Sequence, residues 1–185
     1  MPQESRTPPP KDPAPPFRIT VVCLGNICRS PIGQAVLQHR VYLAGLADEV
    51  WIDSAGTGDW HLGHDADQRA KRILEDHGYP LSHQARQIDP SWIGSIDLLL
   101  AMDASNHADL QRIVAASGRH VTLRMFRSFD PMHEAIPDGD PRLDVPDPYY
   151  GGAEGFAEVL HMIESASDGL LKQLPDLIRS RNEGA

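Results

Sequence analysis

The sequence is poor in cysteine: among its 185 residues only Cys23 and Cys28 occur, five positions apart. Two cysteines this close together cannot form a disulfide framework, so their placement needs a local explanation. The sequence also lacks an apolar run of about 18 residues that could span a membrane. Near its N-terminus it has no apolar segment of about 7–15 residues of the kind found in secretory signals. We therefore expect a cytoplasmic protein with no membrane partner.

Positive charge is scarce as well. The chain has 17 Lys and Arg against 26 Asp and Glu, a formal net charge of -9, and no stripe of basic residues. Nucleic acid and anionic membrane surfaces require such a stripe, so both are excluded as expected partners. Hydrophobic residues make up 41% and charged residues 23%. These values are close to the globular average, which excludes collagen-like, coiled-coil and wholly disordered chains.

Proline is concentrated at one end of the chain. Seven of the 16 prolines fall within residues 1–16, where they prevent a helix and remove the backbone donors that a strand needs. We predict that residues 1–16 form a disordered, partly polyproline tail. Residues 17–185 have the length of one domain, and we predict a single domain there.

From Phe17 onward, short β-rich runs alternate with helical segments, a pattern typical of βαβ units. The pattern predicts strands over Arg18–Cys23, Val50–Asp53, Ile96–Ala101 and His120–Leu123. It predicts helices over Pro31–Ala44 and Ala66–His77, a third from the N-cap Asp103 to Ser117, and a last one from Glu154 that Pro175 kinks or ends. The fold class is therefore α/β, with a four-stranded parallel sheet flanked by helices on both faces in flavodoxin-like topology.

The first strand leads through a short loop into a helix, in the sequence Val21 to Pro31, VVCLGNICRSP. A loop that closes on a helix N-terminus directs backbone N–H groups and the positive dipole end at one spot, which makes an anion site. Cys23 would lie at its floor, where these groups stabilise the nucleophilic thiolate. Arg29 can bind two phosphoryl oxygens with its planar fork, and Ser30 is the expected N-cap. The plain alternative is a buried strand-end cysteine beside an unrelated surface arginine.

A second motif, Asp147-Pro148-Tyr149-Tyr150-Gly151, lies in the aperiodic, proline-containing segment 125–152. Long loops of this kind in a compact domain are usually functional. An aspartate on a stiffened loop suits a general acid, and the adjacent phenol rings suit the walls of a cleft for a flat aromatic substrate. Taken alone, the same residues would also fit a plain turn.

Together these motifs resemble the low-molecular-weight protein tyrosine phosphatase family. The resemblance covers about Phe17 to Leu174 and rests on Cys23–Pro31 and Asp147–Tyr150, with further matching stretches at Asp53–Thr57, Ser82–Ile88 and Met102–Asn106. Gly78–Pro80 together with Arg127–Pro131 is similar to the actinobacterial branch in particular.

The resemblance implies a role for each matching position. It implies that Cys23 is the nucleophile of a phosphocysteine intermediate, that Arg29 holds the phosphoryl group, and that Asp147 is the general acid and later the base. Ser30 would stabilise the Cys23 thiolate. The phosphate loop and its support would comprise Leu24, Gly25, Asn26, Ile27, Cys28, Ser30, Ser54 and His83, with Asn26 in a left-handed conformation.

The resemblance also implies a substrate class. Trp60, Tyr149 and Tyr150 would line the substrate cleft, and the substrate would be a phosphotyrosine-containing protein. Inorganic phosphate or vanadate would bind as a ligand, no metal or cofactor would be needed, and the chain would be a monomer. The chain departs from many relatives at Pro146, where they carry an acidic residue, and in a longer segment from Met132 to Val145.

Other readings of the same residues are weaker. An arsenate reductase needs further cysteines, and none follows Cys28. A phosphoarginine phosphatase typically has threonine at the position of Ile27, and a phosphotyrosine-binding module would not need Cys23, Arg29 and Asp147 together.

Two groups of polar residues suggest metal ligands but lack the required spacing. The first comprises His61, His64, Asp65 and Asp67, and the second Asp138, Asp140 and Asp144. We interpret the first as a loop beside the cleft and the second as charged turn residues.

Overall fold

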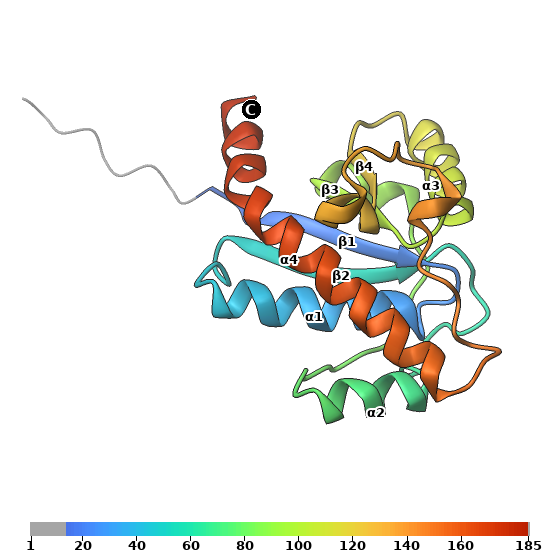
Figure 1. The fold of residues 1–185 in the computed structure, drawn as a ribbon. Coiled ribbons are helices and arrows are strands. Elements are labelled where there is room, and N and C mark those ends of the chain that lie inside the picture. The colour runs from blue at the N-terminus through green and yellow to red at the C-terminus, as the bar shows by residue number, and fades with distance from the viewer. Residues whose placement is uncertain (1–13, 185) are drawn as a thin grey trace, which may run out of the picture.

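The computed structural model describes residues 14–184, so most of the predicted Pro-rich tail lies outside the described residues. Its sheet has four parallel strands in the order β2-β1-β3-β4 (Figure 1). The strands are β1 (Phe17–Cys23), β2 (Val50–Gly56), β3 (Leu98–Ala101) and β4 (Thr122–Met125). This order, in which the chain reverses direction across the sheet after β2, is the flavodoxin-like arrangement, and the fold class predicted from the sequence is confirmed.

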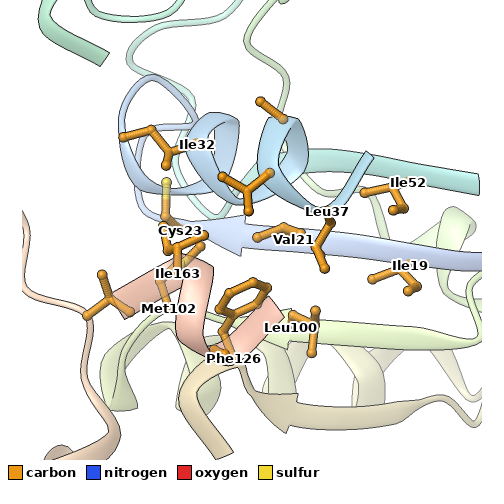
Figure 2. Close-up of a cluster of buried hydrophobic side chains, with 14 of the residues drawn as sticks. Ile19, Val21, Cys23, Ile32, Leu37, Ile52, Leu100, Met102, Phe126 and Ile163 are labelled. Atoms are coloured by element: carbon orange, nitrogen blue, oxygen red, sulfur yellow. The ribbon is translucent and has the colours of Figure 1, made fainter. Parts of the chain in front are cut away.

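Helices cover both faces of the sheet (Figure 1). On one face, α1 (Arg29–Leu43), α2 (Gln68–Asp76) and α4 (Ala153–Glu183) pack into a cluster with alternate residues of β1, namely Ile19, Val21 and Cys23 (Figure 2). On the other face, α3 (Ala104–Ser117) packs through Leu110 against Val22 and its neighbours. Val21 and Cys23 face one apolar cluster and Val22 faces the other, which is why the second half of β1 is a continuous apolar run.

The described loops contain four short 3-10 turns, three of which start after an aspartate. The turns span Pro90–Ser95, Phe126–Phe129, Pro131–His133 and Pro141–Leu143. Asp89, Asp130 and Asp140 each accept a hydrogen bond from the backbone N–H two residues later, and proline follows each of them. This is favourable capping, because proline has no N–H to leave unbonded at the first position.

Helix α2 begins at Gln68, two residues after the predicted Ala66, and two other helices also differ from the prediction. The first helix begins at Arg29, not Pro31, and its N-cap is Cys28, so Ser30 lies inside the first turn and is not the N-cap. Of the two outcomes predicted at Pro175, a kink or an end, the end is excluded, because the last helix continues to Glu183. Leu174 is buried and Leu177 packs against the core, and this packing offsets the lost backbone hydrogen bond.

The end of α4 is also tied to the start of the described chain. Arg181 donates to the Pro15 carbonyl at 2.8 Å and contacts Asp97 at 3.3 Å. The last predicted tail residues therefore contact the domain. Within residues 14–184, no helix combines the length and the apolar character needed to cross a membrane.

Because all four strands are parallel, their carboxyl ends lie at one edge of the sheet. Cys23 is paired with Gly56, Val22 with Ala101, and Ala101 with Met125. The loops that follow these residues meet at this edge, which is where doubly wound folds bind ligands.

Candidate active site

The loop between β1 and α1 is shaped around Asn26. Asn26 has φ 57°, and among residues 14–184 it is the only residue other than glycine with positive φ. Its side-chain amide donates to Ser30 Oγ at 2.8 Å and to Ser54 Oγ at 3.0 Å. Its carbonyl accepts from His83 Nε2 at 2.6 Å, and its amide oxygen accepts from the Arg86 backbone N–H at 3.0 Å. These four bonds hold a conformation that few residues adopt.

His83 is suited to this supporting position as a neutral ring. Burial lowers the pKa of His83 below its ordinary value, although its bond to the Asn26 carbonyl favours the charged form. A neutral ring with its proton on Nε2 donates to the carbonyl and requires no counter-ion. His83 therefore lies behind the loop as a hydrogen-bond donor.

The loop leaves a run of backbone donors without partners. Within the described chain, no N–H group from Leu24 to Ser30 finds a hydrogen-bond acceptor. Consecutive free N–H groups at the start of a helix form a concave anion site, to which the helix dipole adds positive potential. The N-cap Cys28 makes no capping bond with its side chain, which leaves the first-turn donors free.

Cys23 lies at the floor of this loop. It is 3% exposed, and its Sγ is 3.0 Å from Ser30 Oγ. Because Ser30 Oγ accepts a hydrogen bond from Asn26, its own proton can be donated either to the sulfur at 3.0 Å or to the Ala55 carbonyl at 3.4 Å. Ser30 is therefore not the helix cap that the local pattern predicts, but it does contact Cys23, as the family resemblance implies.

Arg29 is buried behind the loop and is held at three points. Its Nη1 is 2.6 Å from Asp103 Oδ2 and donates to the Val145 carbonyl at 3.0 Å, and its Nη2 is 3.6 Å from Asp147 Oδ2. Burial opposes the charged form, but Cys23 and Asp103 favour it more, and the pKa of Arg29 is raised above its ordinary value. The guanidinium is therefore a fixed cation beside the sulfur.

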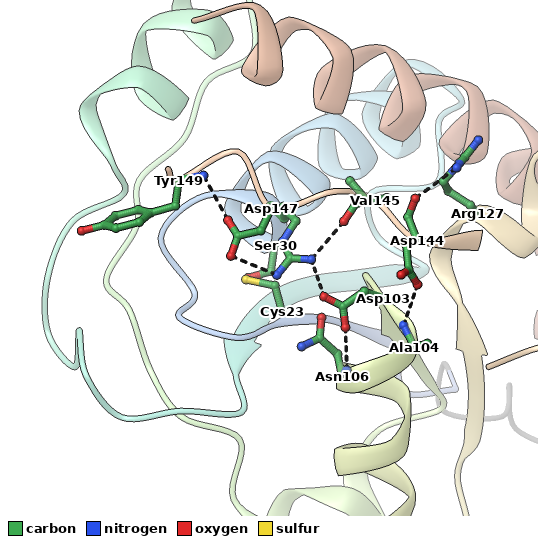
Figure 3. A network of polar contacts seen from close by, with 11 residues as sticks. Cys23, Ser30, Asp103, Ala104, Asn106, Arg127, Asp144, Val145, Asp147 and Tyr149 are labelled. Carbon is green, nitrogen blue, oxygen red and sulfur yellow. Dashed lines mark hydrogen bonds and ion pairs between the residues drawn. The ribbon is translucent and has the colours of Figure 1, made fainter. Parts of the chain in front are cut away.

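Figure 3 shows how two later segments approach the same point. Asp103 begins α3, while Val145 and Asp147 belong to the loop before α4. Asp147 Oδ1 accepts from the Tyr149 backbone N–H at 3.1 Å, and its side chain is 39% exposed. Asp144 points elsewhere, because its Oδ1 accepts from the Ala104 backbone N–H at 2.8 Å. Of these two aspartates, Asp147 is the one that reaches the cleft.

A cleft of about 360 Å³ opens over the loop, lined by Cys23, Leu24, Gly25, Ile27, Cys28, Arg29, Trp60, His61, Asp147, Tyr149 and Tyr150. Trp60 and Tyr150 are largely exposed at its rim, with 68% and 92% of their surface accessible. Asn26, Ser30, Ser54 and His83 do not line it and lie behind the loop. The structure thus brings all predicted site residues to one place, in a lining group and a supporting group.

For three residues of the site, the sequence did not predict the contact that they make there. Asp103 caps α3, as predicted, and also holds Arg29. Arg86 completes the Asn26 network. His61, interpreted as part of a loop beside the cleft, lines the cleft itself next to Tyr149, with ring centroids 6.3 Å apart. The matching stretch Ser82–Ile88 was the available signal for Arg86.

The polar groups that suggested metal sites have other partners. Asp67 pairs with Arg69 and Asp65 with Lys71, while Asp138 pairs with Arg124. Across residues 14–184, no three histidine, cysteine or acidic side chains come close enough to hold a metal ion. The interpretation of Asp138, Asp140 and Asp144 as turn residues agrees with their bonds to backbone N–H groups.

A loop of free N–H groups between the first strand and helix, with a cysteine at its floor and an arginine behind it, defines a phosphate-loop protein of the cysteine-phosphatase class. The family model described as low molecular weight phosphotyrosine protein phosphatase matches residues 18–179. The chain belongs to this family.

Individual relatives agree in length as well as in family. A low molecular weight protein-tyrosine-phosphatase from Streptomyces coelicolor is 48% identical over 165 residues, 89% of this chain and 98% of the relative. Low molecular weight protein-tyrosine phosphatase A of Mycobacterium tuberculosis is 46% identical over 155 residues, 84% of this chain and 90% of the relative. Both come from actinobacteria, which confirms the expected branch.

Solved structures share the fold. A crystal structure of a protein tyrosine phosphatase from Entamoeba histolytica superposes with a TM-score of 0.75 at 31% identity. The match covers 86% of this chain and 97% of that one, and the structure holds Hepes in its active site.

Proposed function

We propose that this chain hydrolyses phosphotyrosine in proteins and that Cys23, Arg29 and Asp147 carry out the reaction. The observation that carries the proposal is the single cleft in which the Cys23 sulfur, the Arg29 guanidinium and the Asp147 carboxyl meet above a run of free backbone N–H groups. A nucleophile, an anion clamp and a proton donor within one cleft are what phosphoryl transfer requires.

In the first step, the Cys23 thiolate attacks phosphorus and forms an S–P bond while the bond from phosphorus to the phenolic oxygen breaks. Asp147 gives its proton to the departing oxygen, so tyrosine leaves as a neutral phenol. In the second step, Asp147 as carboxylate takes a proton from water, and the resulting hydroxide oxygen attacks phosphorus. The S–P bond breaks, which releases inorganic phosphate and regenerates the thiolate and the protonated Asp147.

The loop supplies charge stabilisation in both steps. The N–H groups from Leu24 to Ser30, including those of Gly25, Ile27 and Cys28, can donate to the transferring phosphoryl oxygens, and Arg29 adds a bidentate contact. The Ser30 hydroxyl stabilises the Cys23 thiolate at a separation of 3.0 Å. Ser54 and His83 act through Asn26 by keeping the loop in its shape.

The walls of the cleft favour a flat aromatic substrate. Trp60, Tyr149 and Tyr150 present rings at the rim, and Ile27 presents an aliphatic surface inside it. Aromatic walls suit the ring of phosphotyrosine, whereas a phosphoarginine side chain would need a polar partner for its guanidinium. Phosphate and vanadate bind in the loop as ligands. We further propose that the enzyme is cytoplasmic and works on protein substrates as a monomer.

Hydrolysis of p-nitrophenyl phosphate in EDTA, with and without vanadate, tests this proposal. We expect turnover in EDTA, because every group in the steps above is supplied by the chain, and we expect inhibition by vanadate, an analogue of the transferring group. Absence of turnover would reject phosphatase chemistry. Loss of turnover in EDTA that returns with added metal would reject the metal-free mechanism.

Arg29→Lys should reduce kcat by about 10²–10³, the cost of losing an aligned donor to a developing oxyanion. A lysine retains the charge but not the fork that spans Asp103 and a phosphoryl group. Steady-state kinetics with a phosphotyrosine peptide measures the effect, and thermal melting verifies that the variant is folded. A folded Arg29→Lys enzyme with near-normal kcat would refute the clamp.

Cys28→Ser should make oxidative inactivation harder to reverse. Cys28 is buried, and burial first, then Asp67 and Cys23, raises the pKa of its thiol above the ordinary value, so it is a neutral thiol in this cleft. Peroxide oxidises the Cys23 thiolate to a sulfenic acid, and attack by Cys28 forms a disulfide and releases water. Dithiothreitol then restores the two thiols.

Recovery of activity after peroxide and then dithiothreitol, compared between wild type and Cys28→Ser, measures this protection. We expect nearly full recovery in wild type and poorer recovery in the variant, whose sulfenic acid oxidises further. Equal recovery in both would leave Cys28 as a small packing residue.

A further inference from the structure

The turn that carries Asp147 has few anchors of its own. The chain before it is fixed at Val145, which is buried and donates to the Met102 carbonyl at 2.8 Å. Helix α4 starts after it, at Ala153. Between these points only Pro148 is buried, while residues 146, 147 and 149–152 are exposed. The position of Asp147 therefore depends on contacts from outside the turn.

One side chain supplies such contacts to the backbone of this turn. Arg69, in the first turn of α2, donates from Nη2 to the Tyr149 carbonyl at 2.9 Å and from Nη1 to the Gly151 carbonyl at 3.2 Å. Its guanidinium carbon lies 5.7 Å from the Tyr149 ring centroid and 4.7 Å from that of Phe156, at the start of α4. Among the described residues, no other side chain outside the turn bonds to a backbone atom of residues 146–152.

The other side of the Arg69 guanidinium is fixed as well. Its Nε and Nη2 each lie 3.0 Å from a different oxygen of the Asp67 carboxylate, a bidentate pair. Asp67 is tied to the phosphate loop, because its backbone N–H donates to the Ile27 carbonyl at 2.8 Å. Asp67 and Arg69 thus form a bridge from the loop above Cys23 to the turn that carries Asp147.

The chemistry of this bridge is specific to arginine. The planar Arg69 guanidinium donates four hydrogen bonds, two to the Asp67 carboxylate and two to the carbonyls of Tyr149 and Gly151. The ammonium group of a lysine cannot reproduce this arrangement. The pair itself contributes little to folding, because the Arg69 side chain is 39% exposed and exposed ion pairs have small effects. Its effect should therefore be on the placement of the turn.

We propose that Arg69 is a positioning residue for Asp147: it fixes the proton donor at its distance from the phosphate loop by holding the carbonyls of Tyr149 and Gly151. This inference rests on the proposed function, because it presupposes that Asp147 protonates the leaving group. It predicts that loss of Arg69 impairs proton donation and leaves the nucleophilic attack by Cys23 intact.

The test compares Arg69→Gln with Arg72→Gln on two substrates, a phosphotyrosine peptide and an aryl phosphate with an acidic leaving group. Arg72 lies one turn further along α2, is exposed, and makes no hydrogen bond or ion pair within the described chain. We expect Arg69→Gln to lose about tenfold to a hundredfold in kcat on the peptide and less than threefold on the activated ester. The loss cannot exceed the 10²–10⁴-fold contribution of the general acid itself. Arg72→Gln should match wild type on both.

Two further variants separate positioning from charge and from folding. Arg69→Lys keeps the charge and should behave like Arg69→Gln. Asp67→Asn keeps a good N-cap for α2 but breaks the bidentate pair, so it should show the same selective loss, though a smaller one. In an Asp147→Asn background, Arg69→Gln should cause no further loss on the peptide, because the group that it positions is gone.

The outcomes are distinguishable. Equal losses on both substrates in Arg69→Gln, or wild-type behaviour of Arg69→Lys, would overturn the positioning role. Additive losses with Asp147→Asn would do the same. If wild type hydrolyses neither substrate, the proposed function fails, which is a different result from a variant that loses both substrates equally.

Discussion

Replacing Cys23 by serine is expected to abolish turnover, with a loss of roughly 10⁴-fold or more in kcat, the scale seen when an enzymatic nucleophile is removed. The change from sulfur to oxygen is small in volume, so the loop around it should remain folded. A serine hydroxyl is a poor nucleophile at its ordinary pKa and has no adjacent base here. The 3.0 Å contact to Ser30 can be kept by the new hydroxyl.

Binding should survive the same substitution. The N–H groups from Leu24 to Ser30 and the Arg29 guanidinium are unchanged, so Cys23→Ser should still bind phosphate and a phosphotyrosine peptide. Calorimetry with inorganic phosphate measures this, and steady-state kinetics measures the loss. Activity within tenfold of wild type would place the nucleophile elsewhere. Loss of both activity and binding would point to a damaged loop.

Asp147→Asn should separate substrates by their leaving group. Phosphotyrosine leaves as a phenol with a pKa of about 10 and needs a proton, whereas an ester with a more acidic leaving group needs it far less. We expect a loss of about 10²–10⁴-fold in kcat on phosphotyrosine peptides and a much smaller loss on the activated ester. The basic limb of the pH–rate profile should disappear, because no carboxyl remains to be deprotonated.

Asp144→Asn is the matched control. Asp144 accepts from the Ala104 N–H through Oδ1 and does not line the cleft, and an asparagine oxygen can accept the same bond. The control should keep the wild-type dependence on the leaving group. If Asp147→Asn loses equally on both esters, the residue holds the turn and transfers no proton. If the selective loss appears in Asp144→Asn, the acid is Asp144.

The parts of the site that follow from short-range sequence were predictable. The loop from Cys23 to Ser30 lies between a strand and a helix that the pattern identifies, so its place at the carboxyl edge of the sheet follows from topology alone. Asn26 is among the few residue types that tolerate positive φ, and it adopts φ 57°. The family resemblance supplied its partners Ser54 and His83.

The parts that depend on contacts between distant segments were not predictable from the pattern. The local sequence identifies Asp103 only as a helix cap. Its other carboxylate oxygen, Oδ2, meets Arg29, 74 residues earlier, only in the folded chain. Likewise, Arg69 meets the carbonyl of Tyr149 across 80 residues. Proline inside a helix removes a backbone hydrogen bond, so the local sequence disfavours a helix that continues past Pro175. The packing of the surrounding α4 residues on the core outweighs this cost.

In the proposed reaction, the phosphoryl group passes through Cys23. Asp147→Asn should slow hydrolysis of the phosphoenzyme, since no carboxylate activates the water, so reaction with an activated aryl phosphate followed by acid quench should trap the intermediate. Peptide mass spectrometry at acidic pH should then find one phosphoryl group on the peptide that contains Cys23, and none in the Cys23→Ser, Asp147→Asn double variant. A phosphoryl group on any other residue, or burst release of phenol with no phosphorylated peptide, would rule out a phosphocysteine intermediate at Cys23.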